Sequence, residues 1–258
     1  MNSSSLHQWI DDLAAEGRIS FTAEEAARVH GGEEAAVQGV LRRLRQRREI
    51  ATPLRGYHLI LPPEYRRLGC LPPLWFIDDL AATMKIPYYV SLLSAAELHG
   101  AAHQRPQTFQ VMLSRPHRPI FCEQVHIDFS MRTNLGQLPV MVRNTPKGTV
   151  RIATPEVTAL DLVGYPHRVG GLDHVAGVLA ELAEVLQPKS LLQVAPLSPI
   201  AWSQRLGFLL DLLKFYPTDD LAAYVAEAPL CALDVEQPFT RTTCDPRWRV
   251  FVNIEIEP

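Results

Sequence analysis

The chain has 258 residues, 47% of them apolar and 21% charged, so it can build a real core as one large domain or two ordinary ones. This composition excludes an intrinsically disordered protein. The net charge of −3 excludes a polycationic coat for nucleic acid, although it leaves room for a local basic patch.

The four cysteines occur singly, at Cys70, Cys122, Cys231 and Cys244. Their spacing matches neither a zinc site nor a secreted disulfide framework. The first residues, M-N-S-S-S-L-H-Q-W, lack the basic and apolar regions of a signal peptide. The apolar run L-G-F-L-L-D-L-L is interrupted by Asp211 and is too short to span a bilayer. We therefore expect a cytoplasmic protein with no membrane partner.

Two short helices are predicted before residue 30. Apolar residues at helical spacing between positions 6 and 13 mark the first helix, and Gly17 suits its end. An extended piece follows at residues 18–21. Thr22 and Glu25 have the spacing of a capping box, which begins a second helix that runs to about Val29.

A third, basic helix is predicted over residues 33–49, after a turn at Gly31 and Gly32. One apolar stripe repeats at helical spacing and consists of Val37, Val40, Leu41 and Leu44. The opposite face carries Gln38, Arg42, Arg43, Arg45 and Gln46. Arginine is always charged, and its planar fork can bind a phosphate or the edge of a guanine. The helix therefore has one face to bury and one cationic face to offer.

Two short strands are predicted around a turn at residues 53–56, and they end at Pro62 and Pro63. The order helix, strand, helix, turn, helix, hairpin is typical of a winged helix-turn-helix, whose third helix enters the DNA major groove. Arg55 would lie at the tip of the wing, where a contact with the DNA backbone is useful.

We therefore predict that residues 1–68 form a winged helix-turn-helix that binds double-stranded DNA. Its predicted DNA-binding residues are Gln38, Arg42, Arg43, Arg45, Gln46 and Arg55. One such module buries little surface, so we expect two copies on a repeated or inverted site. The alternatives are a solvated basic helix and a protein-docking module without a role on nucleic acid.

A boundary is predicted in the proline-containing segment 64–73, and residues 74–258 then form the second domain. Its predicted helices are 74–85, 87–100, one that begins at Thr154, 171–186, 199–213 and 218–227. Its predicted strands are 109–114, 125–131, 140–144, 149–152 and 248–256. Strands and helices do not alternate regularly, so we assign the α+β class.

We searched the second domain for chemistry and predict no catalytic residue, no metal site and no cofactor. The rival hypothesis is a metal-dependent enzyme acting on nucleic acid, and its only candidate ligands are Asp128, Glu156 and Asp161. Tyr88 and Tyr89 are expected in the core, although aromatic side chains could also stack on bases.

Four arginines on or beside the predicted strands could extend the nucleic-acid footprint or be solvated strand ends. They are Arg105, Arg115, Arg118 and Arg132.

The sequence resembles the AbiEi-type antitoxins of type IV bacterial toxin–antitoxin systems. The resemblance rests on Y-Y-V-S-L-L-S-A-A-E-L-H-G at 88–100 with Q-x-P at 104–106, A-T-P-E-V-T-A-L-D at 153–161, Q-R-L-G-F-L-L-D at 204–211 and W-x-V-x-V-N at 248–253. One departure is Val157, where an arginine is expected after T-P-E.

This resemblance implies an autorepressor that binds the promoter of its own operon through the winged helix. It also implies a C-terminal domain that counters a nucleotidyltransferase-like toxin, with direct contact between the two proteins not required.

Overall fold

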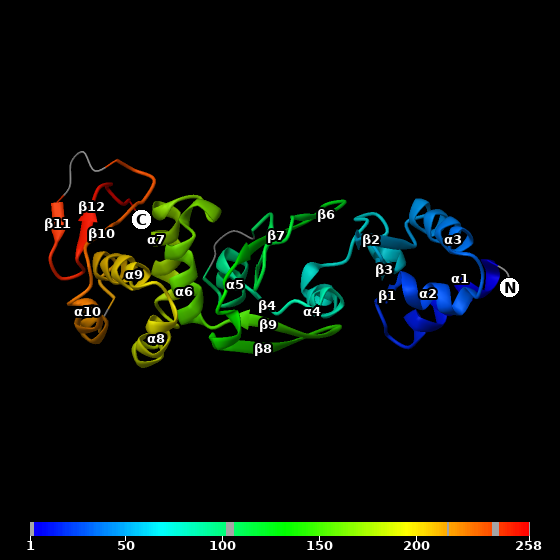
Figure 1. Cartoon of the computed structure of the whole chain (residues 1–258), viewed down its shortest axis with the longest axis horizontal. Helices are drawn as coiled ribbons and strands as arrows, with labels where there is room; N and C mark the ends of the chain where they lie inside the picture. The colour runs from blue at the N-terminus through cyan, green and yellow to red at the C-terminus, as the bar shows by residue number, and fades with distance from the viewer. Residues whose placement is uncertain (1–2, 102–105, 216, 239–242, 258) are drawn as a thin grey trace. The chain divides into compact units, whose positions relative to one another are not determined.

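The structure is a computed structural model that describes residues 3–101, 106–215, 217–238 and 243–257 (Figure 1). Its α-helices are α1 Ser3–Ala15, α2 Ala23–His30, α3 Glu34–Gln46, α4 Pro73–Met84, α5 Leu92–Leu98, α6 Pro155–Gly164, α7 Leu172–Leu182, α8 Pro188–Val194, α9 Ile200–Leu212 and α10 Asp219–Val225. Its strands are β1 Ser20–Thr22, β2 Ile50–Leu54, β3 Tyr57–Ile60, β4 Tyr88–Val90, β5 Phe109–Leu113, β6 Ile120–Cys122, β7 Val125–Met131, β8 Val140–Thr145, β9 Gly148–Ala153, β10 Cys231–Ala232, β11 Thr243–Asp245 and β12 Val250–Val252. The class is α+β, as predicted. None of the helices in these ranges has both the length and the apolar character needed to cross a bilayer.

The chain divides into two compact units. The first unit comprises Met1–Tyr88, Gln107–Thr133 and Val142–Arg151. The second unit comprises Tyr89–Pro106, Asn134–Met141 and Ile152–Pro258. The predicted boundary between residues 68 and 74 separates two domains along the sequence, and it stays a prediction.

The first sixty residues form three helices and a three-stranded sheet, at the blue end of the chain in Figure 1. The predicted capping box begins α2, because the Thr22 hydroxyl accepts from the Glu25 amide and the Glu25 carboxylate accepts from the Thr22 amide. The sheet has the order β1-β3-β2 with antiparallel pairs. Gly56 joins β2 to β3 at φ +82°, a conformation that favours glycine. These elements are compatible with a winged helix-turn-helix.

The core of this region lies under α3. All four residues of the predicted apolar stripe are buried, and the helices α1 and α2 and the sheet pack against them. The cluster consists of Leu6, Ile10, Leu13, Phe21, Ala26, Val37, Val40, Leu41, Leu44, Ile50 and Ile60. Burial of such side chains stabilises a fold by about 1.5–3 kcal/mol each, so it sets which face of α3 points outward.

Helix α4 is bonded to the three-stranded sheet through Asp79. The hydroxyls of Ser20 and Tyr57 both donate to the Asp79 carboxylate, Tyr57 at 3.0 Å. Burial and the charge of Asp79 raise the pKa of Tyr57, so its hydroxyl remains a donor. The neighbouring Asp78 accepts from the Tyr88 hydroxyl at 2.8 Å. Each of these two adjacent acids on α4 therefore has a tyrosine partner.

A second sheet has the strand order β6-β7-β5-β4-β9-β8. Strand β5 pairs parallel with β7, whereas β6 pairs antiparallel with β7. The prediction of one helix over residues 87–100 was wrong at its start. The aromatic and β-branched residues Tyr88–Val90 form a strand, and α5 begins only at Leu92. Strand β6 was not predicted, because a three-residue strand carries no clear periodicity.

In the second unit, α9 supports the small sheet β10-β12-β11. Trp248 is buried, and its indole N–H donates to Asp211 of α9 at 2.7 Å. The ring lies directly over Gly207, where an added Cβ would meet Trp248 Cζ3 at 1.9 Å. Gln204 donates to the carbonyls of Pro229 and Arg249. The predicted strand at 248–256 is shorter than expected, since it covers only β12.

The burial of Leu44 leads to a stability prediction. We expect Leu44→Ala to lower the free energy of unfolding by about 2–5 kcal/mol, because it leaves a cavity under α3. The exposed neighbour Arg43 is the control, and Arg43→Ala should change stability by less than about 0.5 kcal/mol. Urea denaturation followed by circular dichroism measures both. Equal stabilities would contradict the packing described here.

The contact between Gly207 and Trp248 allows a paired test. Gly207→Ala should destabilise the protein by about 1–3 kcal/mol or more, because the new methyl group cannot be accommodated without moving the indole ring. Gly177 of α7 has nothing within 4 Å of an added Cβ, so Gly177→Ala should stabilise the protein by about 0.5–1 kcal/mol. Thermal unfolding of the two variants should therefore shift in opposite directions.

Candidate nucleic-acid interface

The basic face of α3 is free to meet a ligand. Its five predicted polar residues and Arg55 are all exposed, whereas the apolar stripe on the opposite side is buried. No carboxylate within the described ranges forms an ion pair with any of these four arginines. Their positive charge is therefore not neutralised by an ion pair with the side chains that the structure describes.

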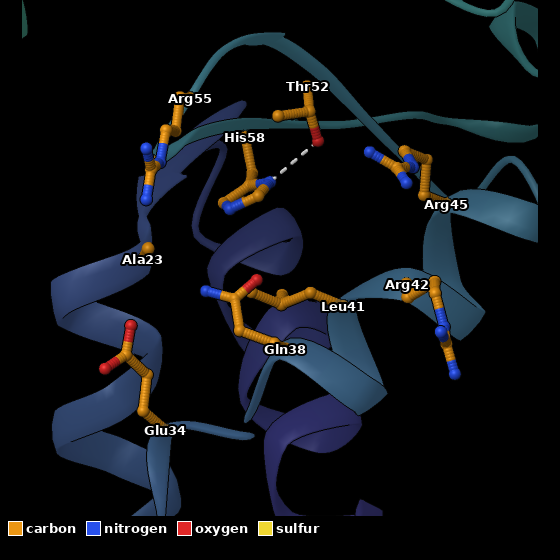
Figure 2. Close-up of a pocket in the computed structure, with 10 residues that line it drawn as sticks. Ala23, Glu34, Gln38, Leu41, Arg42, Arg45, Thr52, Arg55 and His58 are labelled. Carbon is orange, nitrogen blue, oxygen red and sulfur yellow. Dashed lines mark hydrogen bonds between the residues drawn. The ribbon is translucent and has the colours of Figure 1, made fainter. Parts of the chain in front are cut away.

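A groove of about 510 Å³ lies between α3 and the β2–β3 hairpin (Figure 2). Gln38, Arg42 and Arg45 line it from α3, and Arg55 lines it from the turn of the hairpin. The remaining lining residues are Ala23, Glu34, Leu41, Thr52, Gly56 and His58. The structure thus brings together four of the six residues predicted from the sequence.

Arg43 and Gln46 are exposed but do not line the groove. Helical geometry explains the position of Arg43. Gln38, Arg42 and Arg45 fall within about 60° of one another around the helix axis, whereas Arg43 lies about 140° from Gln38. The prediction placed all five polar residues on one face, and the structure separates Arg43 and Gln46 from the groove.

Sequence reasoning missed Thr52 and His58, which come from neighbouring strands. The Thr52 hydroxyl and His58 Nδ1 are hydrogen-bonded at 2.9 Å (Figure 2). The His58 ring also stacks on Phe21, with the ring centroids 5.2 Å apart. Burial, followed by the positive charge of Arg45, lowers the pKa of His58 to about 4. The alternation of side chains along each strand indicates which residues share a face of the sheet. Only the pairing of β2 with β3 shows which residues of the two strands lie next to each other.

One acidic residue, Glu34, also lines the groove. It lies in the first turn of α3, eight residues before Arg42, and Figure 2 shows its carboxylate at the end of the groove away from Arg45. A carboxylate at a helix N-terminus is stabilised by the helix dipole. The groove is therefore lined by three arginines and by one acid, which lies at the end where α3 begins.

The carboxylates offered for an enzyme have structural partners. Asp161 is fully buried and accepts from the Tyr89 hydroxyl at 2.9 Å. Glu156 accepts from the Gln187 amide at 3.1 Å, and Asp128 accepts from the Phe129 amide at 3.0 Å. In the part of the chain that the structure describes, no three His, Cys, Asp or Glu side chains are grouped to hold a metal ion.

Tyr88 and Tyr89 lie in the core, as expected. Of the four arginines that could extend the footprint, Arg132 is buried, and Arg115 and Arg118 are exposed. Arg105 lies outside the described residues.

The low pKa of His58 leads to a pH prediction. Between pH 6.5 and about 4 the unfolded chain binds a proton at this position and the folded chain does not. Stability should therefore fall as pH drops through this range, by about 3 kcal/mol in total. The measurement is urea denaturation across pH for the native chain and for His58→Gln. The variant should lack this part of the pH dependence, and parallel profiles would show that His58 titrates normally.

Comparison with known proteins supports the assignment of the second region. Residues 89–212 match the family model of the AbiEi antitoxin C-terminal domain. A comparison with curated proteins found no match. Among solved structures, the crystal structure of the RV2827C protein from Mycobacterium tuberculosis is similar, with a TM-score of 0.66 and 14% identity over 96% of this chain and 91% of that one. At this identity the likeness shows a shared fold alone.

Three of the four sequence motifs that suggested the resemblance overlap the matched range, and their polar residues Asp161, Gln204 and Asp211 have the structural partners described above. The fourth motif contains Trp248, the partner of Asp211. Residues 89–212 of the chain therefore match the AbiEi antitoxin C-terminal domain family.

Proposed function

We propose that this chain is a DNA-binding transcriptional autorepressor and the antitoxin of a type IV toxin–antitoxin operon. Residues 1–68 act as a winged helix-turn-helix domain on the promoter of its own operon. Residues 74–258 act as the antitoxin domain and counter a nucleotidyltransferase-like toxin, which need not be bound directly. The family match over residues 89–212 supports the antitoxin half.

One observation carries the DNA-binding half: three arginines from two separate elements line one open groove, and none of them forms an ion pair with the described residues. Arg42 and Arg45 lie within one turn of each other on α3, and Arg55 lies across the groove from Arg45, on the turn of the hairpin (Figure 2). In a winged helix the third helix enters the major groove, and the wing contacts the neighbouring backbone. Gln38 would then read base edges, because an amide can both donate and accept there.

Arg43 and Gln46 are assigned a different role from the residues that line the groove. They lie on the exposed side of α3 but outside the groove, so they face the rim of the bound duplex. Arg43 would neutralise a phosphate rather than read a base. A few phosphate contacts give weak binding that depends strongly on salt. Tight binding therefore requires two copies on a repeated or inverted site, because one module of this size buries too little surface.

The test uses the full-length chain and a duplex with the sequence upstream of its own reading frame. Arg42→Ala with Arg45→Ala should abolish the gel shift at moderate salt. For any binding that remains, log Kd should change less steeply with log salt, by about 1.8 per bound chain, because two phosphate contacts are lost. Neither residue belongs to the buried stripe, so the circular dichroism spectrum should not change.

The control removes two positive charges elsewhere, with Lys147→Ala and Lys189→Ala, both exposed. This variant should bind as the native chain does. A native chain that binds unrelated duplexes equally well would rule out specific autorepression. A double arginine variant that still shifts the promoter would show that α3 is not the recognition helix. That variant should also still protect cells from the toxin, since its antitoxin domain is intact.

A further inference from the structure

Two cysteines from distant parts of the sequence lie against each other within the first compact unit. Cys70 belongs to the segment that leads into α4, and Cys122 is the last residue of β6. The Cys70 thiol donates a hydrogen bond to the Cys122 sulfur, and both cysteines are free rather than joined in a disulfide. The proposed function uses neither of them.

The neighbours of the two cysteines hold the two chain segments together. An added Cβ on Gly69 would lie 2.5 Å from Cγ of Glu123, so the residue before Cys70 lies against the residue after Cys122. The amide of Thr52 on β2 also donates to the Cys122 sulfur, and β2 packs against β6 (Figure 1). The folded chain therefore fixes the two sulfur atoms as neighbours.

The two thiols differ in exposure and in acidity. Cys122 is 7% exposed and lies on β6, an edge strand of the six-stranded sheet, whereas Cys70 is 1% exposed. The hydrogen bond from Cys70 lowers the pKa of the Cys122 thiol. The same hydrogen bond, together with burial, raises the pKa of Cys70. Because the thiolate is the nucleophilic form, Cys122 is the more reactive cysteine of the two.

The other two cysteines are arranged differently. Cys231 in β10 and Cys244 in β11 lie on opposite sides of β12 in the small sheet. Strands that are separated by one other strand lie at least about 9 Å apart, which is more than the Cα separation that a disulfide spans. These two cysteines therefore cannot pair with each other in the folded chain.

We propose that Cys70 and Cys122 form a redox-active pair, which a hydroperoxide oxidises to an intrachain disulfide. Cys122 is the attacking thiol, and Cys70 is the thiol that resolves the intermediate. This chemistry goes beyond the proposed function, and it requires neither DNA nor a toxin.

The reaction has two steps when hydrogen peroxide is the oxidant. The Cys122 sulfur, after losing its proton, attacks one peroxide oxygen, so that an S–O bond forms and the O–O bond breaks. The leaving hydroxide takes up that proton and becomes water, and Cys122 becomes a sulfenic acid. The Cys70 sulfur then attacks the Cys122 sulfur, so that an S–S bond forms and the S–O bond breaks. The hydroxyl group leaves with the Cys70 proton as a second water. The two thiols together lose two electrons, and the peroxide gains them.

The disulfide would stabilise the first unit. It would tie the segment before α4 to β6 and close a loop that runs from position 70 to position 122. A cross-link across a long loop reduces the entropy of the unfolded chain, whereas the folded chain already holds the two sulfur atoms together. The oxidised chain should therefore unfold less readily, and proteases that cut the unfolded chain should degrade it more slowly.

The test treats the full-length chain with hydrogen peroxide and then alkylates the thiols that remain. Mass spectrometry of a non-reducing digest should find the peptides of Cys70 and Cys122 joined and lighter by two hydrogen atoms. A thiol reductant should separate them again. The urea concentration at the midpoint of unfolding should rise by about 1 M on oxidation, because the cross-link closes a long loop.

Two substitutions distinguish the attacking thiol from the resolving thiol. Cys70→Ala should leave a sulfenic acid on Cys122, which dimedone traps, whereas Cys122→Ala should leave the Cys70 thiol unmodified. Neither variant should gain stability from peroxide. The matched control replaces Cys231 and Cys244 by alanine, and it should form the same cross-link with the same shift of the urea midpoint. Circular dichroism before oxidation checks the fold, and the cross-link map of the native chain decides if a variant does not fold.

Three results would overturn the proposal. The first is a peroxide-treated native chain in which the Cys70 and Cys122 thiols both remain open to alkylation after unfolding. The second is a set of disulfides that joins separate chains through Cys231 or Cys244 and omits the proposed pair. The third is dimedone labelling of Cys70 in the Cys122→Ala variant, which would show that the assigned order of attack is wrong.

Discussion

The burial of the apolar stripe of α3 is the constraint on which the rest of the N-terminal region depends. Val37, Val40, Leu41 and Leu44 can leave water only by packing on α1, α2 and the three-stranded sheet. Once they do, helical geometry forces the arginines of α3 to the other side, where none of the described carboxylates forms an ion pair with Arg42, Arg43 or Arg45. The core therefore positions α3, which forms one side of the cationic groove, and the β2–β3 hairpin forms the other side.

The hairpin is held by polar contacts as well as by the core. Tyr57 at the start of β3 donates to Asp79 of α4, and Ser20 of β1 donates to the same carboxylate. Hydrogen bonds to a charged group stabilise a structure more than neutral ones do. Because α4 is the element that follows the predicted linker, these bonds connect the three-stranded sheet to the rest of the first unit. Arg55 at the turn lines one groove together with α3 and another together with residues 116–121.

In the second unit, the polar residues of the family motifs act as internal braces. Tyr89 and Asp161 form a buried pair, and Asp211 and Trp248 join α9 to the C-terminal sheet. Position 207 accommodates only glycine, because the indole ring of Trp248 occupies the space that a side chain would need. A buried polar group without a partner costs about 1–3 kcal/mol, so these hydrogen bonds stabilise the fold of the second unit.

The sequence by itself determined the N-terminal helices, because their caps and apolar periods are local signals that agree with the packing. It also determined which α3 residues are buried, and four of the six residues proposed to bind DNA do line one groove. It misassigned Tyr88–Val90, since a strand of three residues is decided by its partners in the sheet. Only the tertiary structure brought His58 to Arg45 and residues 116–121 to Arg55. These neighbours are far apart along the chain, and strand pairing, which no local pattern encodes, sets the distance between them.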